Sequence, residues 1–269
     1  MIHGILPRQA GRPRARRATR ILLALCATAA LLGVDVPDPA SAPPLGVTAA
    51  ARPGTSADRV GALFAGGLDG GHFCTAAVVR SAGRDVIATA AHCLDHPDTT
   101  VFAPGYRDGE APYGVWRLSG AYVAPGWRDG QDPDEDIAFA TLAPLDGALI
   151  EDVVGGFPVA GEQPDDVAVT VLGYPSTRET PLRCANATEL LSATQRRIEC
   201  PDLSGGTSGS PWLADGALAG VLGGYEGGGT VPEVSYSAVM GEGALELYRE
   251  ASARGALALG SPAQGPTAW

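Results

Sequence analysis

The sequence predicts an all-β fold, a sandwich or a barrel, that ends in one helix. Short apolar runs recur from Val60 onward and turn residues separate them, as in proteins built from many short strands. The 37 glycines and 22 prolines favour turns over long helices. Helical periodicity is confined to residues 242–253, where Leu245 and Tyr248 share one face.

The first 42 residues predict a secretory signal peptide. Six arginines precede an apolar run at residues 21–33, and the small residues Ala40-Ser41-Ala42 follow it. About 13 apolar residues are too few to span a bilayer comfortably, so a membrane anchor is the weaker alternative. Residues 49–51 offer a second cleavage site. Residues 43–59, which are rich in Ala, Pro, Gly and Ser, are interpreted as a pro-segment or linker.

The body that remains after residue 42 is strongly acidic. It contains 13 arginines, no lysine and 28 acidic residues, which gives a formal charge of −15. Such a charge argues against nucleic acids and anionic membrane surfaces as partners. We therefore expect a protein that is secreted to the extracellular space and has no stable association with membranes. The 45% of hydrophobic residues is sufficient for a sizeable core.

The predicted strands form two groups, which a connection rich in Pro, Gly and Asp separates at residues 143–166. The domain spans residues 60–254 and ends with the helix at 242–253. Residues 255–269 have no periodic pattern and are predicted to be a flexible tail. The strands are expected at residues 61–65, 75–79, 85–89, 115–118 and 137–142, and then at residues 167–172, 211–213, 218–222 and 234–238.

Four cysteines remain once Cys26, which lies in the apolar run of the signal, is removed. An even number in a secreted protein predicts two disulfides, with three possible connectivities. The pairing of sequence neighbours, Cys74–Cys93 and Cys184–Cys200, is the simplest, and each bond would stabilise the fold by roughly 3 kcal/mol. A zinc site is the alternative, but neither a CxxC nor a His-pair spacing supports it. We expect no metal and no cofactor.

The sequence Gly-Thr-Ser-Gly-Ser-Pro at residues 206–211 places a potential nucleophile on a tight turn. Ser208 is preferred over Ser204 and Ser210 because glycines surround it. Its own backbone N–H and that of Gly206 are expected to form an oxyanion hole, in which each donor contributes roughly 3 kcal/mol. Taken alone, the same hexapeptide is equally consistent with an ordinary Gly/Ser loop.

A serine hydroxyl needs a base that removes its proton, and the base needs a carboxylate that orients it. His92 follows an apolar strand and precedes a cysteine, so its backbone is held on both sides. Asp136 is preferred over Asp134 because it is the last residue of an acidic run and stands where the apolar strand begins. His96 lies in a polar loop, and His72 is given a structural role. The three candidates occur along the chain in the order His, Asp, Ser. This order is informative because different hydrolase folds have different orders.

With these motifs in order, the chain resembles the chymotrypsin-like (trypsin-like) serine peptidases. Thr89-Ala90-Ala91-His92-Cys93 is similar to the family's histidine motif, Asp136-Ile137-Ala138 to its aspartate motif, and Cys74 to the cysteine that bridges to Cys93. The form of residues 206–211 is closer to the bacterial secreted glutamyl-endopeptidase-like branch. The resemblance implies two antiparallel six-stranded β-barrels, at about 60–142 and about 166–241, with the site between them.

The function that this resemblance implies is that of a serine endopeptidase acting on protein or peptide substrates. His92, Asp136 and Ser208 would form the triad, and an acyl-enzyme would be the intermediate. The architecture also implies a monomer. Two alternatives stay open: a catalytically silent binding protein of the same fold, and an esterase that uses the same triad.

Substrate preference is indicated only by residues around the predicted pocket. Asp202 lies six residues before Ser208, where trypsin-type enzymes hold the carboxylate that binds Arg or Lys. Gly223 and Gly224 are predicted to leave room for a large side chain and for pairing with the substrate main chain. Their strand contains no His, which disfavours a pocket that selects acidic residues.

Activation is expected to differ from that of the animal digestive branch. In that branch an Asp precedes the nucleophile and pairs with the new α-amino group after cleavage, whereas this chain has Thr207. The switch is therefore predicted to be absent. The Arg59-Val60 bond is kept as a candidate processing site.

Overall fold

The computed structural model describes residues 46–161 and 167–260, with side chains up to residue 256. The predicted signal peptide, Cys26 and residues 261–269 of the predicted tail lie outside the described residues. All described residues belong to one compact unit of the chain. Among them, no helix combines the length and the apolar character that a membrane crossing requires.

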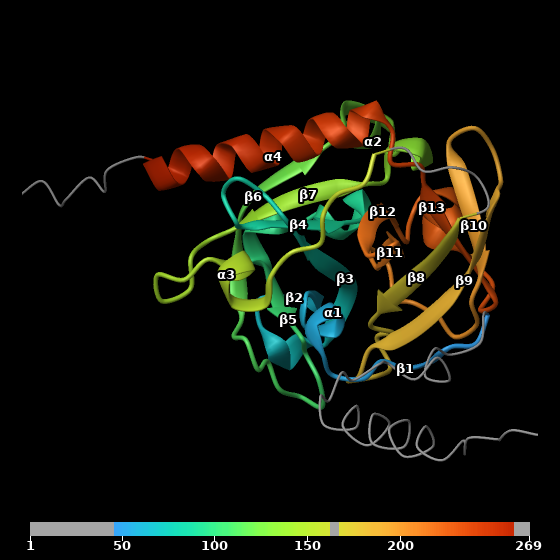
Figure 1. Cartoon of the computed structure of the whole chain (residues 1–269), viewed down its shortest axis with the longest axis horizontal. Coiled ribbons are helices and arrows are strands. Elements are labelled where there is room, and N and C mark those ends of the chain that lie inside the picture. The colour runs from blue at the N-terminus through green and yellow to red at the C-terminus, as the bar shows by residue number, and fades with distance from the viewer. Residues whose placement is uncertain (1–45, 162–166, 261–269) are drawn as a thin grey trace, which may run out of the picture. The chain divides into compact units, whose positions relative to one another are not determined.

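Six antiparallel strands of the first half close into a barrel in the order β2-β3-β4-β7-β6-β5 (Figure 1). Apolar residues fill its interior, and every residue of β4 and β7 is buried. The barrel begins at Val60 and ends at Leu142, at the predicted bounds. Its strands are β2 (Val60–Ala65), β3 (His72–Val79), β4 (Val86–Thr89), β5 (Thr100–Pro104), β6 (Trp116–Val123) and β7 (Ala138–Leu142).

The second half is a sheet of seven strands in the order β12-β11-β8-β9-β10-β13, with the short strand β1 added to β9. The two edge strands of this sheet, β12 and β13, form no ladder with each other. One backbone hydrogen bond links their edges, from Gly223 N–H just after β12 to the Tyr236 carbonyl of β13 (3.0 Å). The predicted all-β fold is therefore confirmed, but the second barrel is an open sheet. Its strands are β1 (Ala49–Ala50), β8 (Ala168–Gly173), β9 (Leu182–Leu190), β10 (Gln195–Glu199), β11 (Pro211–Ala214), β12 (Ala217–Val221) and β13 (Val234–Ala238).

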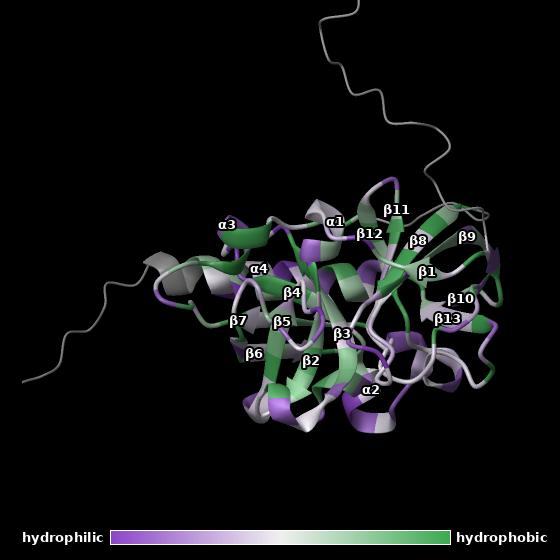
Figure 2. Cartoon of the chain, turned by 90° about the horizontal axis from the view of Figure 1, so that it is seen from below, coloured by the Kyte–Doolittle hydropathy of each residue, from purple (hydrophilic) through white to green (hydrophobic). Residues whose placement is uncertain are grey.

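Hydrophobic and hydrophilic residues are distributed in the same way in both halves. Hydrophobic residues run along the strands, whereas hydrophilic residues gather at the turns between them (Figure 2). The second sheet has its own core of Val171, Ile198 and Trp212, which also buries the Cys184–Cys200 disulfide. The other disulfide, Cys74–Cys93, joins β3 to the turn after β4 in the first barrel. Both predicted pairings are confirmed.

Short helices connect the strands, and one long helix ends the described chain. They are α1 (Thr55–Asp58), α2 (Pro125–Gly130), α3 (Ile150–Val154) and α4 (Glu242–Gly260). Helix α3 lies in the connection for which the sequence predicted no element, because five residues give too little periodicity to recognise.

Helix α4 packs on β4, β6 and β7 of the first barrel (Figure 1). Ala251 is fully buried there, and the Tyr248 hydroxyl donates to the Arg80 carbonyl (2.7 Å). The helix passes its predicted end at residue 253, so residues 255–260 are helical and the prediction of a tail is wrong for them. Gly255 is a glycine because a Cβ there would lie 2.3 Å from an Asp85 carboxylate oxygen. It therefore reflects close packing and does not mark the end of the helix.

Residues 46–59, which we call the N-terminal strap, are an ordered part of both halves. Ala49 and Ala50 pair with Arg183 and Leu182 of β9. The carbonyl of Ala51 accepts a bond from Arg107 of the first barrel (2.8 Å). No pattern in the sequence predicts this strand, because two small residues acquire their conformation only from the distant partner.

The candidate processing bond lies where the strap enters the first barrel. Val60 is fully buried and pairs with Ala77, and the Arg59 carbonyl accepts from Val78 N–H (2.8 Å). The Arg59 guanidinium lies over the Phe157 ring, 5.3 Å from its centroid. Cleavage between Arg59 and Val60 would therefore require local unfolding of the ladder.

Candidate active site

His92 and Asp136 come from adjacent strands of the first barrel. His92 lies in a 3₁₀ turn, Ala91–Leu94, directly after β4, and Asp136 follows a second turn, Pro133–Glu135, just before β7. Because β4 and β7 are paired, the two side chains emerge side by side. His92 Nδ1 lies 2.8 Å from Asp136 Oδ2, and the His92 backbone N–H donates to Oδ1 (3.0 Å).

Asp136 has the environment that a carboxylate needs to orient a base. Its side chain is fully buried, whereas that of His92 is 26% exposed. A third donor, Gly224 N–H, reaches Oδ2 from the second half (2.8 Å). Three hydrogen bonds thus compensate the buried charge. Because a carboxylate only accepts, Nδ1 of His92 carries the proton, which leaves Nε2 as the nitrogen free to act as a base.

Thr75 attaches the Ser208 loop to the first barrel. Its backbone N–H donates to the Ser208 carbonyl (2.7 Å), and its hydroxyl donates to the Gly206 carbonyl (3.0 Å). The same hydroxyl accepts from Tyr174 N–H (2.9 Å), so it is fully used and fully buried. The Cys74–Cys93 disulfide, whose first cysteine precedes Thr75, lies beside the His92 ring: its two sulfurs and a ring nitrogen of His92 lie within 4.8 Å of one another. The loop is therefore held next to His92.

Gly209 brings the same loop against the end of β4. Its φ is +80°, and a Cβ would lie 2.2 Å from both the Thr75 carbonyl oxygen and Thr89 Oγ1. The same Cβ would lie 3.0 Å from Ala90 N, two residues before His92. Only glycine fits here, both sterically and conformationally.

The backbone around Ser208 leaves two N–H groups available. Within the described part of the chain, neither Gly206 nor Ser208 donates its N–H in a hydrogen bond. Thr207 forms the turn between them: its N–H and hydroxyl both donate to the Ser204 carbonyl (3.1 and 2.6 Å). Two free donors flanking a serine are what an oxyanion hole requires.

Gly223 and Gly224 have a structural reason to be glycine. A Cβ at Gly223 would lie 2.8 Å from Asp136 Oδ2, and one at Gly224 would lie 2.4 Å from Gln195 Oε1. These residues therefore make room for the protein's own polar groups. Their predicted pairing with substrate main chain stays a prediction.

Asp202 is exposed, unlike a carboxylate that lies at the base of a substrate pocket. Its side chain is exposed, its φ is +67°, and the preceding carbonyl, that of Pro201, accepts from the Thr48 hydroxyl of the strap. An exposed carboxylate attracts a cation only weakly because water screens it. The burial that would support a role in selecting Arg or Lys is missing.

The remaining histidines lie outside this group. His72 is buried among the rings of Phe64, Tyr106 and Tyr174, and its Nε2 lies 3.0 Å from the Arg178 carbonyl. His96 is exposed. The zinc alternative fails chemically, because the sulfurs nearest to His92 are joined in a disulfide and offer no thiolate.

Three residues near the site gave no signal in the sequence. Thr75 and Gln195 are ordinary polar residues in ordinary strands, and their roles depend on partners far along the chain. Trp127 of α2 places its ring 6.2 Å from the His92 ring. A tryptophan in a loop gives no indication of what it faces.

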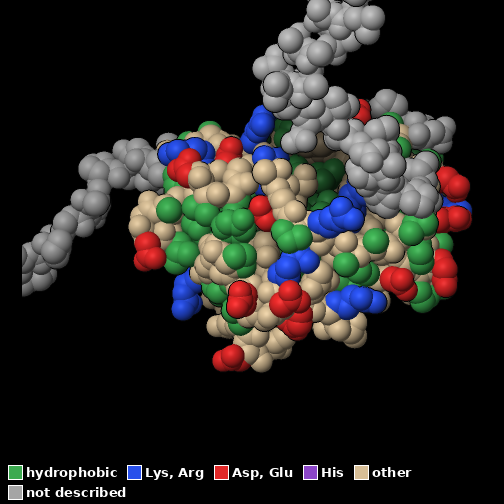
Figure 3. Space-filling model, turned by 60° about the horizontal axis from the view of Figure 1, so that its bottom comes forward, with side chains coloured by type: hydrophobic (Ala, Val, Ile, Leu, Met, Phe, Trp, Pro, Cys, Tyr) green, Lys and Arg blue, Asp and Glu red, His purple; other side chains and the backbone are tan. Residues whose placement is uncertain are grey.

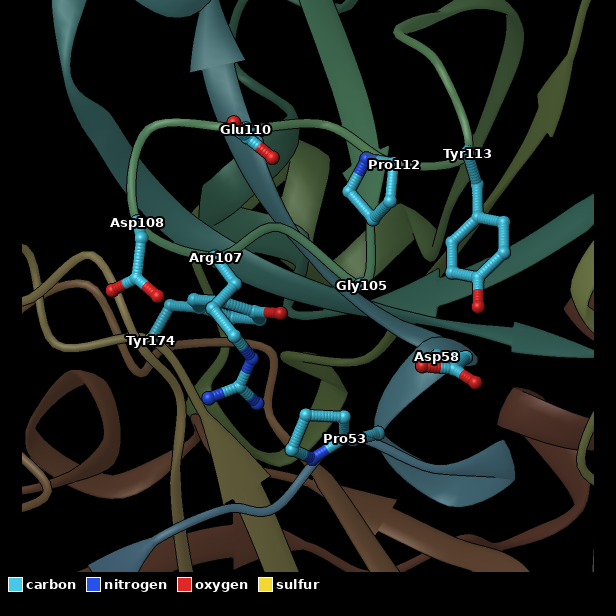
Figure 4. A pocket seen from close by; sticks show the side chains of 10 residues that line it. Pro53, Asp58, Gly105, Arg107, Asp108, Glu110, Pro112, Tyr113 and Tyr174 are labelled. Atoms are coloured by element: carbon cyan, nitrogen blue, oxygen red, sulfur yellow. The ribbon is translucent and has the colours of Figure 1, made fainter.

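A separate hollow of about 470 Å³ lies between the strap and the loop that follows β5 (Figure 4). Asp58, Arg107, Asp108 and Tyr113 line it, and none of the candidate catalytic residues does. Burial, and then the hydrogen bond and charge of Glu179, raise the pKa of the nearby Tyr106 to about 12. That phenol stays protonated and joins the two halves by donating to Glu179.

Comparisons with known proteins agree with this geometry. The family model named Trypsin matches residues 48–237. No curated protein matches the chain. Among solved structures, the protease Anisep from Arthrobacter nicotinovorans is 26% identical with a TM-score of 0.66, covering 77% of this chain and 99% of its own. The thermostable serine protease AL20 from an extremophilic microorganism is 29% identical with a TM-score of 0.65, covering 74% and 99%.

A third structure shares the fold at lower identity. A Glu endopeptidase in complex with MPD is 16% identical, with a TM-score of 0.64, and the match covers 77% of this chain and 96% of its own. At this identity the likeness extends to the architecture alone.

Proposed function

The chain belongs to the trypsin family of serine proteases, and from this premise we propose that it is a secreted endopeptidase whose triad is His92, Asp136 and Ser208. The observation that carries the proposal is the short contact between His92 Nδ1 and the fully buried Asp136 carboxylate (2.8 Å). The free N–H groups of Gly206 and Ser208 support it, because they flank the hydroxyl that would attack.

The proposed reaction has two steps. The Ser208 oxygen attacks the substrate carbonyl while His92 Nε2 takes its proton, and the oxyanion is stabilised by the two N–H groups. The imidazolium then protonates the leaving amine, and the peptide bond breaks to give an acyl-enzyme. Water, deprotonated by His92, attacks the ester carbonyl and releases the acid and the free serine. Asp136 stays ionised throughout and orients the imidazole.

Secretion is the second part of the proposal. The two disulfides support it, because such bonds persist in oxidising compartments. The basic and then apolar N-terminal sequence also supports it. Recovery of the protein from the culture medium, with an N-terminus beyond residue 42, is the expected result. Protein retained in membranes with residue 1 intact would contradict it.

Labelling with a fluorophosphonate tests the triad. The native protein should be labelled at one serine, and Ser208→Ala should not be labelled. Ser204→Ala, which removes an exposed hydroxyl two residues before Gly206, is the matched control and should be labelled normally. An unlabelled native protein would instead indicate a silent binding protein. Labelling together with cleavage of esters but not of peptides would indicate an esterase.

Preference for Arg or Lys before the scissile bond is the least supported part of the proposal, since it depends on Asp202 alone. A peptide library should show cleavage after these residues, and Asp202→Ala should reduce it. A different preference that survives this substitution would remove Asp202 from the specificity site.

A further inference from the structure

We propose that Gln195 is a positioning residue that aligns the His92–Asp136 pair from the second half of the molecule. The inference rests on the proposed peptidase function and adds to it a residue that does not touch substrate. Gln195 opens β10 and is only 4% exposed. Its amide joins two segments that lie far from it in sequence and that both contact Asp136.

The amide makes three hydrogen bonds. Nε2 donates to the Pro133 carbonyl (2.8 Å) and to Asp134 Oδ1 (2.9 Å), whereas Oε1 accepts from Tyr225 N–H (3.1 Å). A carbonyl and a carboxylate can only accept, and a backbone N–H can only donate. The partners therefore fix the orientation of the amide and require a side chain with a donor and an acceptor at its end.

Both segments lead directly to Asp136. Pro133 and Asp134 belong to the turn that immediately precedes Asp136. Tyr225 immediately follows Gly224, whose N–H donates to Asp136 Oδ2. Gln195 thus holds the loop that carries the carboxylate and the strand end that donates to it. One amide thus makes hydrogen bonds to both segments.

The fit around the amide is close. Gly224 has φ +78°, and a Cβ there would lie 2.4 Å from Gln195 Oε1. The Gln195 backbone is itself anchored, because its carbonyl accepts from Leu191 N–H (2.9 Å) and its Cα pairs with Ala238 of β13. A paired strand therefore supports the amide, which leaves no room for a side chain at position 224.

The expected consequence is catalytic as well as structural. If the amide is lost, the Pro133–Glu135 turn and Gly224 are free to separate, and Asp136 no longer fixes the His92 ring. Misplacement by about 1 Å at a reacting group can lower a rate by about a hundredfold. A looser ring that keeps all three triad residues should lie below this limit, at a loss of about tenfold.

The experiment uses Gln195→Met, which keeps the length but no hydrogen bond, in the full mature chain. Thr188→Val is the matched control: Thr188 is 2% exposed on the neighbouring strand β9, and its hydroxyl donates to the Val167 carbonyl (3.0 Å). We expect Gln195→Met to slow labelling by a small fluorophosphonate, and to lower kcat for a peptide, by about tenfold. Thr188→Val should leave both rates unchanged even where its melting temperature falls equally.

A spectroscopic readout separates alignment from stability. The proton between His92 Nδ1 and Asp136 should give a downfield NMR resonance in the native protein and in Thr188→Val. In Gln195→Met this resonance should broaden, since the loosened hydrogen bond exchanges faster with water.

A second pair of variants tests the hydrogen bonds themselves if Gln195→Met does not fold. Gln195→Glu keeps the volume but places a carboxylate against Asp134, and it should slow labelling. Adding Asp134→Asn supplies a donor to that carboxylate and should recover part of the rate. Equal rates for native protein and Gln195→Met, or no recovery in the double variant, would overturn the proposal. Failure of the native protein itself to label would instead refute the peptidase function.

Discussion

Gly209 shows how one residue without a side chain sets the position of the proposed nucleophile, Ser208. Its missing Cβ lets the Ser208 loop lie against Thr75 and Thr89, and its positive φ turns the chain so that Gly209 N–H reaches the Leu222 carbonyl (2.7 Å). The first barrel, which carries His92, is thereby joined to the second sheet through the residue after the serine.

Gly209→Ala should therefore abolish both folding to the native state and labelling. The methyl group would lie 2.2 Å from two oxygen atoms in a conformation that L-residues rarely adopt. Gly205→Ala is the control, since nothing lies within 4 Å of its Cβ and its φ is not positive, and we expect a change in stability within about 0.5 kcal/mol. Soluble, labelled Gly209→Ala would show that the loop can move.

The sequence was sufficient to nominate those candidate site residues that lie in local motifs. His92, Asp136 and Ser208 each stand at a junction between an apolar strand and a turn, which a reader of the sequence can recognise. Thr75 and Gln195 cannot be found this way, because their partners lie 131 and 62 residues away. Asp202 shows the converse: its spacing from Ser208 suggested a pocket carboxylate, whereas the folded chain leaves it exposed, which a spacing cannot reveal.

Helix α4 places its C-terminal part over a buried acid. Asp85 is 7% exposed, and the backbone of Gly255 lies against its carboxylate. Burial raises the pKa of Asp85 above its ordinary value of 3.8; its own backbone opposes this shift, and the charge of Glu151 adds to it. Folding therefore shifts the carboxyl towards its protonated form relative to the unfolded chain. The stability that it contributes is complete below pH 3.8 and is lost as the pH rises through the raised pKa.

Asp85→Asn should raise the melting temperature relative to the native protein at pH 8 more than at pH 4. The reason is that the native protein must hold more of this buried charge under α4 at the higher pH. Thermal unfolding at the two pH values measures the difference, and Asp152→Asn, which changes an exposed acid paired with Arg84, is the control. An equal effect of Asp85→Asn at both pH values would contradict this interpretation.

The N-terminal strap should be required for stability and not be an inhibitor. A chain that begins at Val60 loses β1 and the bond from Arg107 to Ala51, and each lost hydrogen bond costs roughly 1 kcal/mol. We expect a lower melting temperature and no gain in kcat. A chain that begins at Gly46 is the control and should behave like the longer protein. Higher activity of the Val60 chain at equal stability would identify residues 43–59 as a pro-segment.

Elements were predictable where their residues pack within one continuous pattern. The first barrel begins and ends where the apolar runs begin and end, since β2, β3, β4 and β7 are almost entirely buried. Strand β6 is predominantly not buried and extends beyond its predicted end at residue 118, and β5 was not among the expected strands. The strap was not predictable, because β1 takes its conformation from β9, more than a hundred residues away. The open edge of the second sheet was not predictable either, because it depends on one backbone bond, from Gly223 to Tyr236, where a ladder was expected.

The charge of the whole molecule should influence substrate capture. Acidic side chains and arginines are interspersed on the face shown in Figure 3, but acids predominate in residues 43–269, with a formal charge of −15. A negative field raises the encounter rate of cationic substrates and is screened over roughly 10 Å at 0.1 M salt.

We therefore expect kcat/KM for a lysine-rich peptide to fall between 0.02 and 0.5 M NaCl, by roughly several-fold. A glutamate-rich peptide with the same cleavage site should gain over the same range, and a neutral one should change little. Identical salt profiles for the three peptides would show that the field at the site differs from that of the whole surface.

Each half of the molecule packs against the terminal segment that is joined covalently to the other half. The strap lies on the second sheet through β1 and then enters β2, whereas α4 leaves β13 and packs on the first barrel. With the central connection, three covalent crossings join the halves. Short tethers keep two surfaces at an effective concentration on the order of millimolar or more. Any separation of the halves is therefore reversed as an intramolecular event, which keeps the proposed triad, His92 and Asp136 in one half and Ser208 in the other, from being diluted.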